Sequence, residues 1–115
     1  MLKIYGIKNC DTVKKALKWL EANGIEFEFY DYKKQGVDED VLTGLVGKFG
    51  WDKILNLKSR TWRMLDDKER PVNANQAIEL AKQQSSIIKR PIIDNGKDIQ
   101  IIGFKEEEYK SLLNN

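Results

Sequence analysis

The side chain with the clearest chemical capability in this sequence is Cys10, its only cysteine. Cys10 follows a short apolar segment and a loop, and it directly precedes a segment whose apolar residues have helical spacing. At a helix N-terminus, unpaired backbone N–H groups and the positive end of the dipole favour an anion. Such sites lower the pKa of a cysteine from its free value of about 8.5. The position therefore predicts a nucleophilic thiolate.

A buried structural cysteine is the alternative interpretation, because free cysteine is among the most buried residue types. The polar neighbours Asn9, Asp11 and Thr12 favour a reachable sulfur, and we expect Asn9 and Thr12 to contact the substrate. Val13 occupies the position where a dithiol oxidoreductase carries its second cysteine. A mixed disulfide on Cys10 therefore needs a thiol from outside the chain, and glutathione is the obvious supply in a bacterial cytosol.

The composition excludes several other classes of protein. A chain of 115 residues is expected to form one domain, and its net charge of +2 does not fit a dedicated nucleic-acid binder. The absence of histidine removes Ser–His and Cys–His dyads and His-ligated metals, so no metal is expected. A lone cysteine, no signal peptide and no apolar run long enough for a membrane span predict a cytoplasmic protein. We expect it to act as a monomer.

Hydrophobic periodicity and turn residues divide the chain into three parts: a strand–helix–strand unit, a helical middle, and a hairpin followed by a helix. The first helix is predicted to end at Asn23-Gly24, and the hairpin to turn at Asn95-Gly96. Strands are predicted over residues 2–5, 26–32, 91–94 and 99–102. Helices are predicted from Cys10 to Asn23 and over residues 38–49, 74–84 and 105–113, with a further turn at 51–55. Residues 56–70 carry no clear pattern.

This order predicts an α/β fold with a four-stranded mixed sheet, because the strands of a strand–helix–strand unit are parallel and those of a hairpin are antiparallel. A βαβ half followed by a ββα half is the thioredoxin arrangement. We expect one thioredoxin-like domain over residues 1–115, in which residues 1–35 and 87–115 form the core. Residues 36–86 then form a helical insertion between the two halves.

The sequence resembles the arsenate reductase-related family, which includes the Spx regulators, and it is most similar to the YffB-like branch of glutathione-dependent thiol reductases. The resemblance covers nearly the whole chain. The residues that carry it are Tyr5-Gly6-Ile7-Lys8-Asn9-Cys10-Asp11-Thr12, Thr61-Trp62-Arg63-Met64-Leu65, Ile87-Ile88-Lys89-Arg90-Pro91-Ile92 and Gly103-Phe104.

The resemblance implies that Cys10 is the nucleophile of an arsenate reductase-like oxidoreductase, with glutathione as cosubstrate. It also implies that Arg90 matches a family arginine beside the cysteine and that Pro91 matches the cis-proline of thioredoxin folds. An arginine offers a planar fork that suits an oxyanion or carboxylate, such as those of glutathione. A proline before a strand leaves room for a substrate backbone.

A basic cluster, Lys58, Arg60 and Arg63, stands near the first position of the arginine trio that arsenate reductases of this family use. It is interpreted either as an anion pocket facing Cys10 or as a solvated loop.

Two functions follow from the sequence. One is a monothiol glutathione-dependent reductase. The other is a non-catalytic adaptor, similar to Spx, that binds a protein partner such as RNA polymerase.

Overall fold

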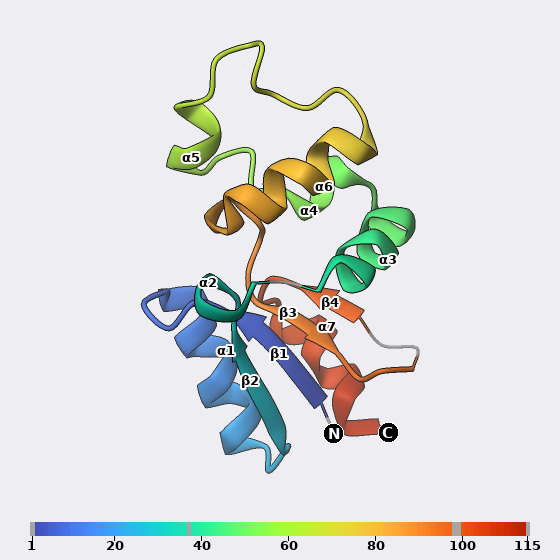
Figure 1. Ribbon diagram of the computed structural model, residues 1–115. Helices are drawn as coiled ribbons and strands as arrows, with labels where there is room; N and C mark the ends of the chain where they lie inside the picture. Colours follow the sequence, from blue (N-terminus) through green and yellow to red (C-terminus); the bar gives the residue numbers. More distant parts are fainter. Residues whose placement is uncertain (1, 37, 98–99, 115) are drawn as a thin grey trace. The chain divides into compact units, whose positions relative to one another are not determined.

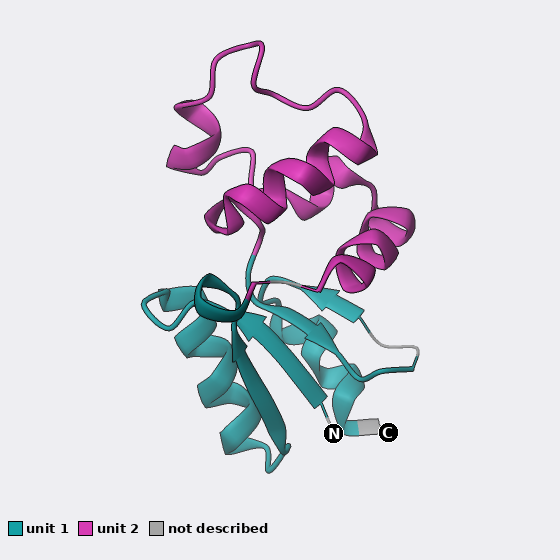
Figure 2. Ribbon diagram, viewed as in Figure 1, with its two compact units in different colours: residues 1–35, 90–115 teal, residues 36–89 magenta. Residues whose placement is uncertain are grey.

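The chain divides into two compact units, which Figure 2 shows in different colours. The computed structural model describes residues 2–36, 38–97 and 100–114. Residues 1–35 and 90–115 form one unit, here called the core unit, and residues 36–89 form the other, here called the helical unit. The second boundary lies after residue 89 rather than 86. Ile88 bridges Leu55, and the Lys89 amide donates to the Ile54 carbonyl (2.9 Å), so residues 87–89 belong to the helical unit. A single domain over the whole chain stays a prediction.

The core unit contains a mixed sheet of four strands in the order β2-β1-β3-β4 (Figure 1). The strands β1 and β2 are parallel, whereas β3 is antiparallel to both β1 and β4, which confirms the predicted pairing. Their bounds are Leu2–Gly6 (β1), Phe27–Asp31 (β2), Ile92–Asp94 (β3) and Gln100–Ile102 (β4). The second strand ends at Asp31 rather than at Tyr32, because Tyr32 begins a one-turn helix, α2 (Tyr32–Gln35).

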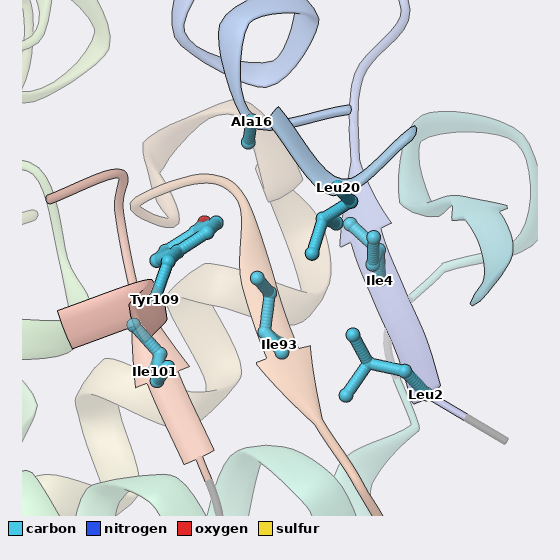
Figure 3. Packing of buried hydrophobic residues seen from close by; sticks show 7 residues of the cluster. All are labelled: Leu2, Ile4, Ala16, Leu20, Ile93, Ile101 and Tyr109. Carbon is cyan, nitrogen blue, oxygen red and sulfur yellow. The ribbon is translucent and has the colours of Figure 1, made fainter. Parts of the chain in front are cut away.

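Two helical segments complete the core unit: α1 (Asp11–Ala22), and α7 (Glu106–Tyr109) with the 3-10 turn η2 (Lys110–Asn114). The predicted last helix is thus α-helical only in its first turn and then tightens, as short terminal helices often do. Buried side chains from the strands and both helical segments form one cluster (Figure 3). Its members are Leu2, Ile4, Ala16, Leu20, Ile93, Ile101 and Tyr109. This cluster fixes α1, and therefore the residue before it, against the sheet.

The hairpin is confirmed, with a longer connection than a two-residue turn. Asp94 pairs with Gln100, so residues 95–99 lie between the paired positions. The Gly96 amide donates to the Asp94 carboxylate (2.8 Å), and Gly96 has a positive φ of 78°, a conformation that favours glycine. Ile99, which the prediction includes in the strand, lies outside the described residues.

The helical unit consists of short helices, and three of them start at a capping side chain. Asp38 accepts a hydrogen bond from the Asp40 amide (2.8 Å), Ser59 from the Trp62 amide (3.1 Å) and Asn73 from the Gln76 amide (2.9 Å). In the helix that follows Asn73, the residues Ala77, Ile78, Leu80 and Ala81 are buried. The elements are α3 (Glu39–Phe49), α4 (Trp51–Ile54), α5 (Arg60–Arg63), α6 (Ala74–Gln83) and η1 (Ser85–Ile87). In the described part of the chain, no helix is long and apolar enough to cross a membrane.

Candidate functional site

The strand register brings three chain segments together at one edge of the core sheet. Gly6 at the end of β1 pairs with Asp31 at the end of β2, so the residues that follow both strands emerge side by side. Tyr5 pairs with Ile92 at the start of the antiparallel β3, so Arg90 and Pro91 lie at the same edge. Ligands of α/β proteins bind outside the carboxyl ends of parallel strands. The register therefore places Cys10, Tyr32 and Arg90 around one edge.

Cys10 is the N-cap residue of α1, with extended backbone angles (φ −128°, ψ 123°) and a half-buried side chain. The Lys14 amide donates to its carbonyl (3.0 Å), which closes the first helical turn. Gly6 permits the helix to start this close to the strand, since a Cβ at position 6 would stand 3.1 Å from the Val13 side chain. The sequence thus places the sulfur at the amide end of the helix.

Arg90 acts on Cys10 across this edge of the sheet. Hydrogen-bonding and charge interactions of its half-buried guanidinium with the Cys10 sulfur and the Tyr32 hydroxyl raise the pKa of Arg90. The Arg90–Pro91 peptide is cis, as the resemblance implies, and Pro91 is buried. The Pro91 carbonyl accepts from the Gly103 amide (2.8 Å), which holds the segment beside the sheet. The structure therefore brings Cys10 and Arg90 together.

Tyr32 is the site residue that the sequence analysis missed. Its side chain is 1% exposed, although it lies at the start of a one-turn helix with exposed neighbours. The signal that could have found it is the predicted parallel pairing. The residue after the second strand must leave the sheet at the same edge as the loop that leads to Cys10.

Opposing influences set the pKa of the Cys10 thiol. Burial works to raise it, but the backbone N–H of Val13, the hydrogen bond and charge of Arg90 and the N–H of Thr12 together hold the pKa below its ordinary value. Within the described residues, the sulfur makes no side-chain capping hydrogen bond of regular geometry, so the amides act chiefly as nearby dipoles. The site favours the thiolate.

Burial also works to lower the pKa of Arg90, but the hydrogen bonds and charges of Cys10 and Tyr32 outweigh it, so the pKa is raised. For Tyr32, burial raises the pKa more than Arg90 lowers it. At neutral pH the site therefore contains a cationic guanidinium and a neutral phenol.

Alkylation should reveal this balance directly. Only the thiolate reacts with iodoacetamide, so the rate of Cys10 alkylation falls as pH decreases. We expect the midpoint of this fall to lie at a lower pH in the native chain than in the same chain in denaturant. The measurement is the pH profile of the alkylation rate for both states. A native midpoint at or above the denatured one would contradict the assigned electrostatics.

The remaining predicted site residues fall into two groups. Asn9 is exposed in the turn before Cys10, and Thr12 is exposed in the first turn of α1. Lys58, Arg60 and Arg63 belong to the helical unit, where their side chains are exposed. Of these three, Arg60 lines a surface hollow with Thr61, Met64, Leu65, Glu69 and Gln84. A pocket that joins the three cations to Cys10 stays a prediction. Across residues 2–36, 38–97 and 100–114, no His, Cys, Asp or Glu cluster could hold a metal ion.

A four-stranded mixed sheet with a cysteine at the N-terminus of its first helix and an arginine before the third strand defines a thioredoxin-like α/β protein of the thiol-redox class. The profile of the ArsC family matches residues 5–112. The chain belongs to the ArsC family, whose fold is arsenate reductase-like.

Similar proteins agree with this assignment over nearly the full chain. A Haemophilus influenzae protein of uncharacterised function is 45% identical over 113 residues, which cover 96% of this chain and 97% of the relative. The solved structure of the YffB protein PA3664 is 38% identical, with a TM-score of 0.91 and coverage of 96% and 97%. An arsenate reductase-related protein from Brucella melitensis is 40% identical, with a TM-score of 0.75 and coverage of 99% and 95%.

The global transcriptional regulator Spx of Streptococcus mutans is a more distant relative. It is 25% identical over 115 residues, which cover 98% of this chain and 83% of the regulator. Regulators and arsenate reductase-related proteins thus share this fold.

Proposed function

We propose that this protein is a monothiol, glutathione-dependent reductase in which Cys10 is the nucleophile and Arg90 stabilises its thiolate. The contact between the Arg90 guanidinium and the Cys10 sulfur carries the proposal, because it joins a cation to the only thiol in the chain. Arginine keeps its charge at any physiological pH, so the thiolate is favoured whatever the substrate.

The reaction has two steps. The Cys10 thiolate attacks the glutathione sulfur of a glutathionylated substrate; the substrate's S–S bond breaks, and the substrate leaves as a thiolate that takes a proton from water. Cys10 then carries glutathione as a mixed disulfide. The thiolate of a second glutathione attacks the bound glutathione sulfur, which releases oxidised glutathione and regenerates the Cys10 thiolate. Reduced glutathione is the electron donor, and the substrate disulfide is reduced by two electrons.

The residues around Cys10 supply binding groups for this chemistry. Asn9 and Thr12 are exposed and lie near Cys10 in the sequence. Pro91, which has no N–H, directly precedes β3. In this proposal they contact the peptide part of glutathione. Lys58, Arg60 and Arg63 are proposed to receive its carboxylates. Such a protein works in a reducing compartment, which for this chain we propose to be the cytoplasm.

The Spx relative supports a second candidate function, a regulatory adaptor that binds a protein partner such as RNA polymerase. Val13 stands three residues after Cys10, so this chain has no Cys-x-x-Cys pair with which to form an internal disulfide. An adaptor built on this chain would therefore not switch through an internal disulfide.

One experiment separates the two functions. The protein is mixed with oxidised glutathione and its intact mass is measured. The reductase predicts one glutathionyl group per chain, removed when reduced glutathione is added. An untreated sample and a sample with reduced glutathione alone serve as controls. A chain that stays unmodified under conditions that modify an unfolded reference peptide would reject the reductase and leave the adaptor.

A further inference from the structure

Tyr32 is a buried side chain with a hydroxyl at the sheet edge, and the proposed reaction gives it no role. It is 1% exposed, and burial of a hydroxyl is costly unless it is hydrogen-bonded. The strand register brings Arg90 to the same edge of the sheet, and interactions of its guanidinium with Tyr32 and Cys10 raise the pKa of Arg90. A guanidinium has only donors, so the Tyr32 oxygen is the acceptor in this pair.

The surroundings of Tyr32 hold its oxygen in one place. Gly6 pairs with Asp31, so the backbone of Tyr32 is set directly by the end of the parallel β1–β2 ladder. The Asp31 carboxylate accepts from the Lys33 amide (3.0 Å), which fixes the turn on the other side of Tyr32. A buried ring on a doubly fixed backbone is a rigid acceptor. Arginine, by contrast, has a long side chain with many rotamers to lose.

We propose that Tyr32 is a positioning residue whose buried hydroxyl accepts a hydrogen bond from the Arg90 guanidinium and holds that guanidinium against the Cys10 sulfur. The charged and titratable groups that influence the pKa of Tyr32 are Arg90, Cys10 and Asp31. The pKa of Cys10 is influenced by one charged side chain, Arg90, and by the backbone amides of Thr12 and Val13. Tyr32 therefore influences the sulfur mainly through the placement of Arg90. This inference rests on the proposed function only in taking Cys10 as the reactive thiol.

The test is the pH profile of Cys10 alkylation in a Tyr32→Phe variant, which removes the oxygen and keeps the buried ring. We expect the midpoint to move to higher pH and the rate at pH 7 to fall about threefold, as follows from a partial loss of the Arg90 contact. Tyr30→Phe is the matched control. The Tyr30 hydroxyl donates to the Glu28 carboxylate (2.6 Å), and Tyr30 does not contribute to the electrostatics of Cys10.

A double-mutant cycle shows whether Tyr32 acts through Arg90. In an Arg90→Gln background, Tyr32→Phe is expected to have no further effect on the profile. If the double variant is slower than Arg90→Gln by the factor that Tyr32→Phe causes in the wild type, the tyrosine acts on the sulfur by another route. If Tyr32→Phe has the wild-type profile, the tyrosine does not act on the sulfur at all. Either result overturns the inference.

A measurement without a substitution at position 32 covers the case in which the variant does not fold. In the wild type labelled with ¹⁵N-arginine, the Arg90 Nε–H signal should be resolved by NMR and should shift as Cys10 titrates. A signal that coincides with those of exposed arginines overturns the inference.

These readouts use no glutathione, so they separate this inference from the proposed function. If the alkylation midpoint of the wild type lies below that of the denatured chain and Tyr32→Phe has the same midpoint as the wild type, only the role of Tyr32 is lost. If the wild-type midpoint is not lowered, the reductase itself loses its support.

Discussion

A Cys10→Ser variant is expected to reduce glutathionylated substrates at no more than the uncatalysed rate. Serine keeps the size of the side chain at the start of α1 and remains a good N-cap residue, so the fold is retained. Its hydroxyl is not ionised at neutral pH, and no other thiol exists in the chain. The measurement is the release of glutathione from a glutathionylated peptide, with unfolding by urea as the check on folding.

A relocated thiol is the matched control for this loss. Ser59 is the N-cap residue of α5, so the double variant Cys10→Ser, Ser59→Cys restores one cysteine at another helix start. We expect it to bind alkylating reagents and to stay near the background in turnover. Substantial turnover by Cys10→Ser, or full turnover by the relocated thiol, would show that Cys10 and its surroundings are not the catalytic site.

The second large effect is expected from Arg90→Gln. The substitution removes the charge and the charged hydrogen bond of Arg90, both of which lower the pKa of Cys10, so the pKa rises. Loss of an opposite charge at contact distance changes the thiolate fraction, and hence the alkylation rate at pH 7, by about tenfold or more. Stopped-flow alkylation across a pH series measures this.

The direction of the Arg90 effect with pH is fixed by the chemistry. At a pH above both midpoints the thiol is ionised in both proteins and the rates should converge; below them the variant should be slower. Lys89→Gln is the control. It removes an equal charge at the residue before Arg90, and the Lys89 side chain does not contribute to the pKa of Cys10. Equal slowing by the two substitutions would mean that net charge, rather than the contact, controls the thiol.

The same lowered pKa links Cys10 to folding. The native state favours the thiolate, so its contribution to stability is complete above the thiol pKa of the unfolded chain. That contribution is lost as pH falls through the native pKa, which lies below the pKa of the unfolded chain. Arg90→Gln should therefore reduce the gain in stability on the alkaline side.

The sheet could be predicted from the sequence because local residue patterns indicate each strand. Ile4 and Phe29 lie in short runs of strand-forming residues, and Asn23-Gly24 stops the helix between them. The position of Cys10 followed from the same signals, since the first apolar residue of the helix is Val13. Family resemblance, rather than periodicity, placed Arg90 beside it.

The features that could not be predicted depend on contacts far apart in the sequence. The sequence pattern includes Tyr32 in the second strand with the aromatic residues before it. The strand register shows that Tyr32 follows β2 at the edge where Cys10 lies. The one-turn helix α5 has no apolar stripe, and its start is decided by the hydroxyl of Ser59. The tightening of the last helix after Tyr109 likewise has no marker residue in the sequence.

The close approach of Gly6 to Val13 limits how this scaffold can be re-engineered. Any side chain at position 6 meets Val13 at 3.1 Å and pushes on the turn whose amides act on the sulfur. Mutagenesis libraries aimed at new substrates should therefore keep positions 6 and 13 constant. Diversity belongs in residues 7–9, which form the partly exposed loop between them and can change specificity while the nucleophile keeps its charge.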